Sequence, residues 1–330
     1  MKLTVLGAGA WGTALAASWA AHHAVTLWGR NAAEIDTMRA TRLNARYLPD
    51  CPLPESLAFS TDFAAAVRSA DLVVVAVPSG ALRATLAALA SDTALPPLVW
   101  VCKGFEPGNR KLPHELVAEL LPAHAQTGVL SGPSFAQEVA HGYPTALTLA
   151  SADTTFSQTL AESLSGHRLR IYAHDDVVGV EVGGALKNVM AIAAGISDGL
   201  AFGHNARAAL ITRGLAEMTR LGVKLGGRFE TFMGLSGLGD LILTTTGDLS
   251  RNRQVGLQLA RGRSLDTILH DLGHVAEGVT TAREVATLST TLGIDMPITR
   301  AVCQILFEGL PAAEAVDTLL KREIKAEFPR

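Results

Sequence analysis

The sequence predicts an α/β domain with a mostly parallel, doubly wound sheet over residues 1–175, followed by an all-helical domain over residues 176–330. In the first half, short apolar runs alternate with Ala- and Leu-rich segments and lack the polar alternation of half-exposed strands, which is typical of βαβ units. After about residue 175, strand-like runs cease and apolar positions recur at helical spacing. A chain of 330 residues is also long for one hydrophobic core.

The expected elements follow in chain order. Apolar runs predict strands at residues 3–7, 25–29, 71–78, 98–104, 127–132, 144–151 and 167–173, with helices at 11–21, 80–91 and 111–121 between them. In the second half, helical periodicity predicts helices at residues 177–198, 205–225, 251–261, 277–292 and 301–310. Gly226, Gly262 and Gly293 follow three of these segments, as expected near helix ends.

Composition limits the classes of function. The net charge of −3 gives no electrostatic footprint for nucleic acid. The three cysteines, Cys51, Cys102 and Cys303, are widely spaced without a CxxC pair, which argues against a disulfide framework and a zinc site and favours the cytoplasm. None of the histidines has the spacing of a metal ligand set, so we expect no metal.

The N-terminus contains no Asp, Glu, Lys or Arg from Leu3 to Gly29 and superficially resembles a secretory signal. Three glycines at nucleotide-loop spacing break the run, so we interpret it as strand, turn and helix. Elsewhere no run of 18 or more apolar residues is free of charges and helix breakers, which predicts no membrane span.

A glycine-rich turn follows the first predicted strand. Gly7-Ala-Gly9-Ala-Trp-Gly12 reads G-x-G-x-x-G and leads directly into a predicted helix. Gly7 permits the tight turn, Gly9 lets a pyrophosphate approach the backbone, and Gly12 permits close packing of helix on strand. The helix N-terminus would bind the pyrophosphate. The sequence therefore predicts a Rossmann-type dinucleotide-binding domain, although an ordinary glycine-rich turn has the same pattern.

Arg30 follows the second predicted strand, about 20 residues beyond the glycines. An NAD-specific site usually has an acidic residue here, which accepts a hydrogen bond from the ribose 2′-hydroxyl. A guanidinium would instead pair with a 2′-phosphate. We therefore expect NADP(H) to be preferred, with NAD(H) possible; the alternative is a solvated arginine at the strand end.

Two further loops, Val77–Gly80 and Cys102–Gly104, follow predicted strands, where ligands of doubly wound sheets bind. Lys103 stands in the second of these loops. Lys187 is unusual in another way, because it is the only ionisable residue between Glu181 and Asp198 in an apolar helical segment. A lysine is rarely buried unless it is paired, and burial shifts its pKa readily. A snorkelling side chain, a structural ion pair and a catalytic acid/base are the three interpretations.

The helical half contains a second polar group. Asp240 follows a glycine-rich turn, and Ser250, Arg251 and Asn252 open a predicted helix. Ser250 is an ordinary helix N-cap on one interpretation. On the other, amides, a hydroxyl, a guanidinium and a carboxamide at one helix N-terminus form a phosphate site. Asp240 could cap its own helix or pair with Lys187.

Nine segments in this order resemble the bacterial NAD(P)-dependent glycerol-3-phosphate dehydrogenases. They are GAGAWGTALA, LWGRN, RYLPD, VCKGFE, LSGPSFAQEVA, EVGGALKNVMAIAAGISDG, GLSGLGDLILT, SRNRQVG and VAEGVTTA. The resemblance implies Lys187 as the proton-transfer residue. It implies substrate contacts from Lys103, Gly132, Ser134, Lys187, Asp240, Ser250, Arg251 and Asn252. It implies cofactor contacts from Gly7, Gly9, Ala10, Trp11, Gly12, Arg30, Tyr47, Lys103, Ala136, Arg251, Val275 and Glu277.

The chain departs from that family at Ala10, because the family's loop often has serine there. Alanine keeps the backbone amide but loses a hydroxyl that could bond a cofactor phosphate, at a cost of about 0.5 to 1.5 kcal/mol of binding.

The resemblance implies a reversible reduction of dihydroxyacetone phosphate to sn-glycerol 3-phosphate, which supplies phospholipid synthesis, and it suggests a homodimer. A ketopantoate or β-hydroxyacid reductase of similar architecture is one alternative, although it would need a carboxylate-binding cluster where the segment at Ser250 suits phosphate. A non-catalytic NADP-sensing module is the alternative from another class.

Overall fold

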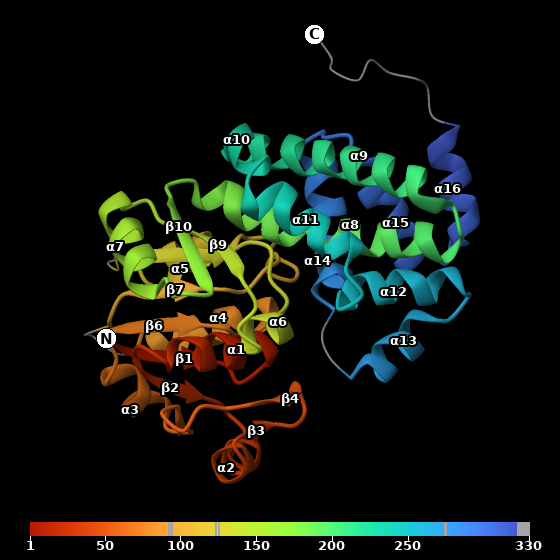
Figure 1. Cartoon of the computed structure of the whole chain (residues 1–330). Coiled ribbons are helices and arrows are strands. Elements are labelled where there is room, and N and C mark those ends of the chain that lie inside the picture. Colours follow the sequence, from red (N-terminus) through yellow and green to blue (C-terminus); the bar gives the residue numbers. More distant parts are fainter. Residues whose placement is uncertain (92–94, 123, 125, 274–275, 322–330) are drawn as a thin grey trace.

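The computed structural model describes residues 1–330 apart from 92–94, 123, 125, 274–275 and 322–330. A strand-rich half leads into a helical half (Figure 1). The strands form one eight-stranded sheet in the order β10-β9-β8-β7-β6-β1-β2-β5, and β8 and β9 are its antiparallel pair. A two-stranded hairpin, β3 and β4, stands apart from this sheet.

The strands are short and mostly buried, as continuous apolar runs in a parallel sheet should be. Their bounds are β1 Lys2–Leu6, β2 Ala24–Trp28, β3 Leu43–Asn44, β4 Leu48–Pro52, β5 Ala58–Ser60, β6 Leu72–Val75, β7 Leu98–Trp100, β8 Thr127–Ser131, β9 Thr145–Ala150 and β10 Leu169–His174. All seven predicted strands are confirmed, whereas β3, β4 and β5 were not predicted.

Helices connect the strands and cover both faces of the sheet. They are α1 Ala10–Trp19, α2 Ala32–Thr41, α3 Phe63–Arg68, α4 Ser79–Leu89, α5 Pro113–Leu120, α6 Ala136–Ala140 and α7 Thr154–Leu164. The chain runs outward from β1 to β2 and β5, then returns to the other side of β1 to form β6. The crevice at the carboxyl ends of β1 and β6 is therefore a topological switch point, the usual ligand-binding position of such sheets.

The second half contains α8 Val177–Gly199, α9 Gly203–Lys224, α10 Phe229–Phe232, the π-helix η1 Leu235–Gly239, α11 Asp240–Thr246, α12 Arg251–Ala260, α13 Leu265–Leu272, α14 Glu277–Thr291, α15 Pro297–Phe307 and α16 Ala312–Leu320. The predicted helix at 301–310 thus begins earlier, at Pro297. The cause is tertiary, because the buried carboxylate of Glu217 on α9 accepts hydrogen bonds from the backbone amides of Ile298 and Thr299 at 2.6 and 3.1 Å.

Helix α8 lies at the centre of the helical half (Figure 1). It is buried from Gly179 to Ser197, and α9, α11, α12 and α14 pack against it. Within the described part of the chain, α8 alone is long and apolar enough to cross a membrane. Because 89% of its apolar window is buried by the fold, it has the character of a core helix.

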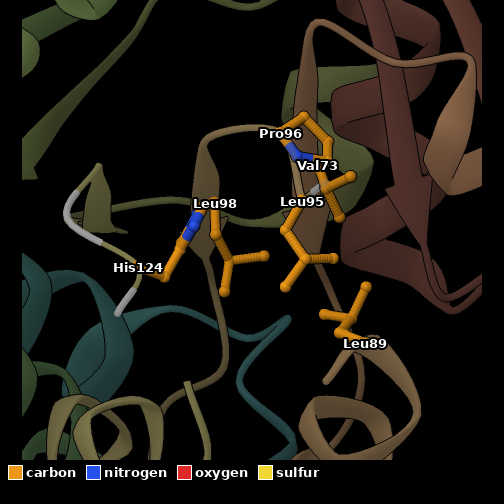
Figure 2. A pocket seen from close by; sticks show the side chains of 6 residues that line it. All are labelled: Val73, Leu89, Leu95, Pro96, Leu98 and His124. Atoms are coloured by element: carbon orange, nitrogen blue, oxygen red, sulfur yellow. The ribbon is translucent and has the colours of Figure 1, made fainter. Parts of the chain in front are cut away.

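A small cavity on the sheet lies apart from the crevice at the carboxyl ends of β1 and β6. Figure 2 shows its lining, which consists of Val73, Leu89, Leu95, Pro96, Leu98 and His124. The space does not admit a water molecule and its walls are almost entirely apolar. It is a packing gap between β6 and β7, and it contributes nothing to a ligand site.

Candidate active site

The glycines of the turn after β1 have the steric roles that the motif predicts. Gly7 has φ of +123°, and a Cβ there would lie 2.6 Å from the carbonyl oxygen of Ala76 after β6. A Cβ on Gly12 would lie 2.0 Å from the carbonyl oxygen of Gly7. A Cβ on Gly9 would meet no atom within 4 Å. The backbone at Gly9 therefore faces open space, as a position approached by a ligand must.

The N-terminus of α1 is suited to an anion. Gly9 is its N-cap and provides no side-chain acceptor, so first-turn amides are free to bind an external acceptor such as a pyrophosphate. Ala10, Trp11 and Ala136 pack together against the small core between α1, β4 and α6. These three predicted cofactor residues therefore share one wall beside the turn, and a dinucleotide fits the chemistry of this crevice.

Arg30 lies one residue beyond Gly29 at the end of β2 and is exposed. Within the described ranges no carboxylate lies within ion-pair distance of its guanidinium. Asn31 beside it caps α2 by accepting hydrogen bonds from Ala33 and Glu34. The arginine is thus a free cation at the strand end where an adenosine ribose would lie.

Glu277, the first residue of α14, joins the two halves of the molecule. Its carboxylate accepts hydrogen bonds from the backbone amide and the hydroxyl of Ser79, the first residue of α4, at 3.2 and 2.5 Å. Burial raises the pKa of Glu277, while the bonds from Ser79 and the charge of Arg251 oppose that rise. The contact places Glu277 at the carboxyl end of β6, beside the nucleotide loop.

Arg251 lies close to Glu277. Its side chain is exposed, but protein atoms around the guanidinium lower its pKa, while the neighbouring Glu277 and Tyr47 oppose this change. Tyr47 belongs to the turn between β3 and β4 and is half-buried. Three predicted cofactor residues from distant parts of the sequence thus lie close enough to interact electrostatically.

Lys187 does not snorkel to the surface; it is buried and paired. Its ammonium donates to Asp240 Oδ1 at 2.5 Å and to Thr244 Oγ1 at 3.0 Å. Lys103 donates to the other oxygen of the same carboxylate, Oδ2, at 2.7 Å and to the carbonyl oxygen of Gly132 at 3.1 Å. Two ammonium groups, one from each half of the molecule, therefore share a carboxylate that is 0% exposed.

Burial determines the ionisation of Lys187. Burial is the main reason that the pKa of the ammonium falls to about 7. The charge of Lys103 lowers this pKa as well, whereas the charge of Asp240 raises it. Neither of the two charges alone sets the pKa, because desolvation is the largest effect. A lysine that titrates near neutrality can both donate and accept a proton, which is the requirement for acid/base work at physiological pH.

Asp240 reaches this position because of the π-helix before it. Gly239 is the N-cap of α11, so Asp240 is the first helical residue and does not act as the side-chain cap. Of the two roles that the sequence left open, the structure shows the pairing with Lys187. π-Helical turns are frequent at functional sites because they redirect the residues that follow them.

Glycines on α8 permit this approach. A Cβ on Gly183 would lie 2.4 Å from the backbone oxygen of Ser236 in η1. A Cβ on Gly184 would lie 2.7 Å from Ser131 Oγ and 3.5 Å from the stem of Lys103. The helix is therefore slim where η1 and the Lys103 loop pack against it, one turn before Lys187.

We expect Gly183→Ala to lower kcat by roughly a hundredfold, because the added methyl must displace the backbone of η1 and with it Asp240. Steady-state kinetics and circular dichroism of the same preparation test this. Gly166→Ala is the matched control, since its Cβ would meet nothing nearer than His22 at 3.8 Å. Equal activity of the two variants would contradict the steric argument.

Helix α12 packs against α8. Ser250 is its N-cap and accepts from the amide of Arg253 at 3.2 Å, which confirms the ordinary capping role while its hydroxyl proton remains available for another acceptor. Asn252 Oδ1 accepts from the amide of Gly278, and Nδ2 donates to Asn188 Oδ1, both at 3.0 Å. One N–H of Asn252 remains for a ligand.

The structure thus brings Lys103, Lys187, Asp240 and Gly132 together, and Arg251, Glu277 and Tyr47 form a second group. Ser134 Oγ donates to the carbonyl oxygen of Gly132 at 3.1 Å. Val275 lies outside the described residues. Sequence reasoning missed Thr244 and Asn188, and it singled out the loop Val77–Gly80 without naming Ser79. The adjacency of Asn188 to Lys187 and the i+4 spacing of Thr244 from Asp240 were available signals. Among the described residues, no group of three or more His, Cys, Asp or Glu could hold a metal ion.

Family models, curated relatives and solved structures with high sequence identity name the same family. The family models for the N-terminus and the C-terminus of NAD-dependent glycerol-3-phosphate dehydrogenase match residues 2–157 and 176–317. A glycerol-3-phosphate dehydrogenase [NAD(P)+] of Thiobacillus denitrificans is 79% identical over 99% of this chain and 100% of its own length. The crystal structure of a glycerol-3-phosphate dehydrogenase from Coxiella burnetii is 44% identical, with a TM-score of 0.92 over 97% of this chain and 99% of that one.

A more distant match has the same fold only. The structure of a probable 2-dehydropantoate 2-reductase from Bacillus subtilis is 14% identical, with a TM-score of 0.55 over 93% of this chain and 99% of that one. The reductase alternative is therefore not favoured. With both family models matched in order and a relative identical at four-fifths of positions, the chain belongs to the NAD-dependent glycerol-3-phosphate dehydrogenase family and is an NAD(P)-dependent oxidoreductase.

Proposed function

We propose that this chain reduces dihydroxyacetone phosphate to sn-glycerol 3-phosphate, reversibly, and that residues 1–175 bind the cofactor while 176–330 bind the substrate. The observation that carries the proposal is the buried Lys187 ammonium, which shares the Asp240 carboxylate with Lys103 from the strand-rich half. Bound NADPH would supply the hydride to the carbonyl carbon.

Each residue then has a defined role. As the carbonyl oxygen gains negative charge, Lys187 stabilises it and donates a proton; in the oxidation direction its neutral amine accepts one. Asp240 orients both lysines. We propose that the substrate phosphate binds the α12 N-terminus, with Ser250, Arg251 and the free N–H of Asn252. We propose that Gly132 and Ser134 contact the substrate from the opposite side.

The decisive experiment compares NADPH oxidation with dihydroxyacetone phosphate and with ketopantoate. We expect turnover of the first and little of the second, because a helix N-terminus with a guanidinium suits a phosphate dianion. Equal rates would favour the reductase alternative, and cofactor binding without turnover of either would favour a sensing module.

For the cofactor, we propose contacts from the loop Gly7–Gly12, Arg30, Tyr47, Lys103, Ala136, Arg251, Val275 and Glu277. The free guanidinium of Arg30 supports a preference for NADP(H) over NAD(H), since it would pair with the 2′-phosphate.

We expect Arg30→Asp to lower the ratio of kcat/KM with NADPH to kcat/KM with NADH by about ten- to a hundredfold, the value of a charge-assisted hydrogen bond. The control is Arg170→Asp, an exposed arginine on the edge strand β10. A ratio unchanged by Arg30→Asp would remove the claim.

The product is a precursor of glycerophospholipids, and we propose that the enzyme serves their synthesis in the cytoplasm as a homodimer. The free state of Cys51, Cys102 and Cys303 supports a reducing compartment. Exposed apolar side chains on the helical half, namely Phe202, Val223, Phe229, Met233, Ile242 and Leu249, support self-association.

A further inference from the structure

Helix α8 has a second buried ionisable group, Glu181, which the proposed reaction does not use. Its side chain is 1% exposed. Oε1 accepts hydrogen bonds from the indole Nε1 of Trp100 at 2.8 Å and from the backbone amide of His114 at 2.9 Å. Oε2 lies 2.5 Å from His114 Nδ1. All of the acceptor oxygens thus bind groups of the strand-rich half.

Trp100, one of these partners, stands directly before the loop Cys102–Gly104, which carries Lys103. Trp100 is the last residue of β7, and Lys103 follows three residues later. The intervening Val101 remains attached to the sheet through its amide, which donates to the carbonyl oxygen of Val75 at 2.9 Å. At the far side of the loop, Gly104 packs against Ser79 and Thr281. The chain from Trp100 to Lys103 therefore has little freedom once Trp100 is held.

Both ends of the segment from Trp100 to Lys103 are linked to residues of α8. Glu181 holds Trp100 at one end, and at the other end Lys103 shares the Asp240 carboxylate with Lys187. Resting on the proposed function, we infer that Glu181 is a positioning residue, which through Trp100 and His114 sets the distance between Lys103 and the proton-transfer group Lys187.

Electrostatics support the contact of Glu181 with His114 and Trp100. Burial raises the pKa of Glu181, and the contacts from His114 and Trp100 lower it. Burial lowers the pKa of His114, but the hydrogen bond and charge of Glu181 outweigh burial and the net direction is upward. Cys102, the other ionisable neighbour, is buried and its pKa is raised. His114 thus favours the carboxylate form of Glu181, and Glu181 favours the protonated form of His114.

A residue that only caps α5 or fills space would lower stability without changing the electrostatics at Lys187. A positioning residue would change them in a predictable direction. Asp240 and Lys103 are the ionisable groups that act on Lys187, and Lys103 lowers its pKa. If Lys103 moves away, the pKa of Lys187 must rise, and the midpoint of the pH–rate profile must follow.

The test is the pH profile of kcat/KM for NADPH-dependent reduction of dihydroxyacetone phosphate by the full-length enzyme. Glu181→Leu should raise the midpoint by about one pH unit and lower kcat about ten- to a hundredfold. Glu181→Gln keeps an oxygen for both N–H donors and should restore a midpoint close to that of the wild type.

Trp100→Phe removes the indole donor and should move the midpoint in the same direction by less. Trp19→Phe is its matched control, because that equally buried indole donates to the carbonyl oxygen of Leu164 at 3.1 Å, away from the site. If Glu181→Leu fails to fold, the midpoints of the pH profiles of Trp100→Phe and Trp19→Phe test the positioning role in its place.

The positioning role would be overturned if the variants Glu181→Leu and Trp100→Phe, where they fold, have a lower kcat but the same midpoint as the wild type. The proposed function fails separately, if the wild-type enzyme does not reduce dihydroxyacetone phosphate or shows no midpoint near neutrality.

Discussion

The Lys187→Met variant is expected to lose about 10²- to 10⁴-fold in kcat, the usual contribution of a positioned proton-transfer group. The variant should still fold, because methionine fills the apolar surroundings of α8 and Asp240 keeps its second partner, Lys103, at 2.7 Å. Cofactor binding should persist, since the hydrogen bonds of Lys187 go to Asp240 and Thr244 in the helical half. Stopped-flow measurement of the hydride-transfer step and fluorescence titration with NADPH separate the two effects.

The pH dependence of the wild-type enzyme should report the same group. Burial lowers the pKa of Lys187 to about 7, and kcat/KM reports the ionisation of the free enzyme. Reduction needs the ammonium, so kcat/KM for reduction should fall as the pH rises through about 7. Oxidation needs the neutral amine, so kcat/KM in that direction should rise through the same pH.

Lys224→Met is the control, because Lys224 is exposed in the last turn of α9. It should leave both profiles unchanged. Near-wild-type kcat in Lys187→Met, or a profile with the opposite sign, would rule out the proton-transfer role and leave a purely structural ion pair.

The parts of the fold that were predictable have a local signal in the chain. Buried parallel strands read as continuous apolar runs, and a glycine pattern between strand and helix has a steric reason at each position. The strands β3, β4 and β5 lacked that signal, because they are partly exposed and β4 contains prolines. The start of α15 depended on a carboxylate from another helix, Glu217.

The site divides in the same way. Lys187 was noticeable because a single charge in an apolar helix must have a partner or a function. Its partner was not predictable, because the choice for Asp240 between capping and pairing depends on the π-helix before α11. The sharing of that carboxylate with Lys103 depends on the packing of Gly183 and Gly184, which only the tertiary structure shows.

Asp240→Asn should have the second large effect, because it leaves two ammonium groups without their counter-charge in a buried position. Breaking a buried pair in this way typically costs about 3 to 5 kcal/mol. The carboxylate raises the pKa of Lys187, so its loss should move the midpoint of the reduction profile about one to three units toward acid pH. At pH 7 Lys187 would then be mostly neutral, and reduction would slow more than oxidation.

The sign of the stability effect follows from the same ionisation. At low pH both lysines are charged, and the variant should be least stable relative to the wild type. As the pH rises, Lys187 loses its proton and one uncompensated charge disappears, so the difference in melting temperature should shrink. Asp248→Asn is the control, since that carboxylate is 92% exposed and pairs with Arg253, not with either lysine. A midpoint that stays in place in Asp240→Asn would show that Asp240 does not govern the charge of Lys187.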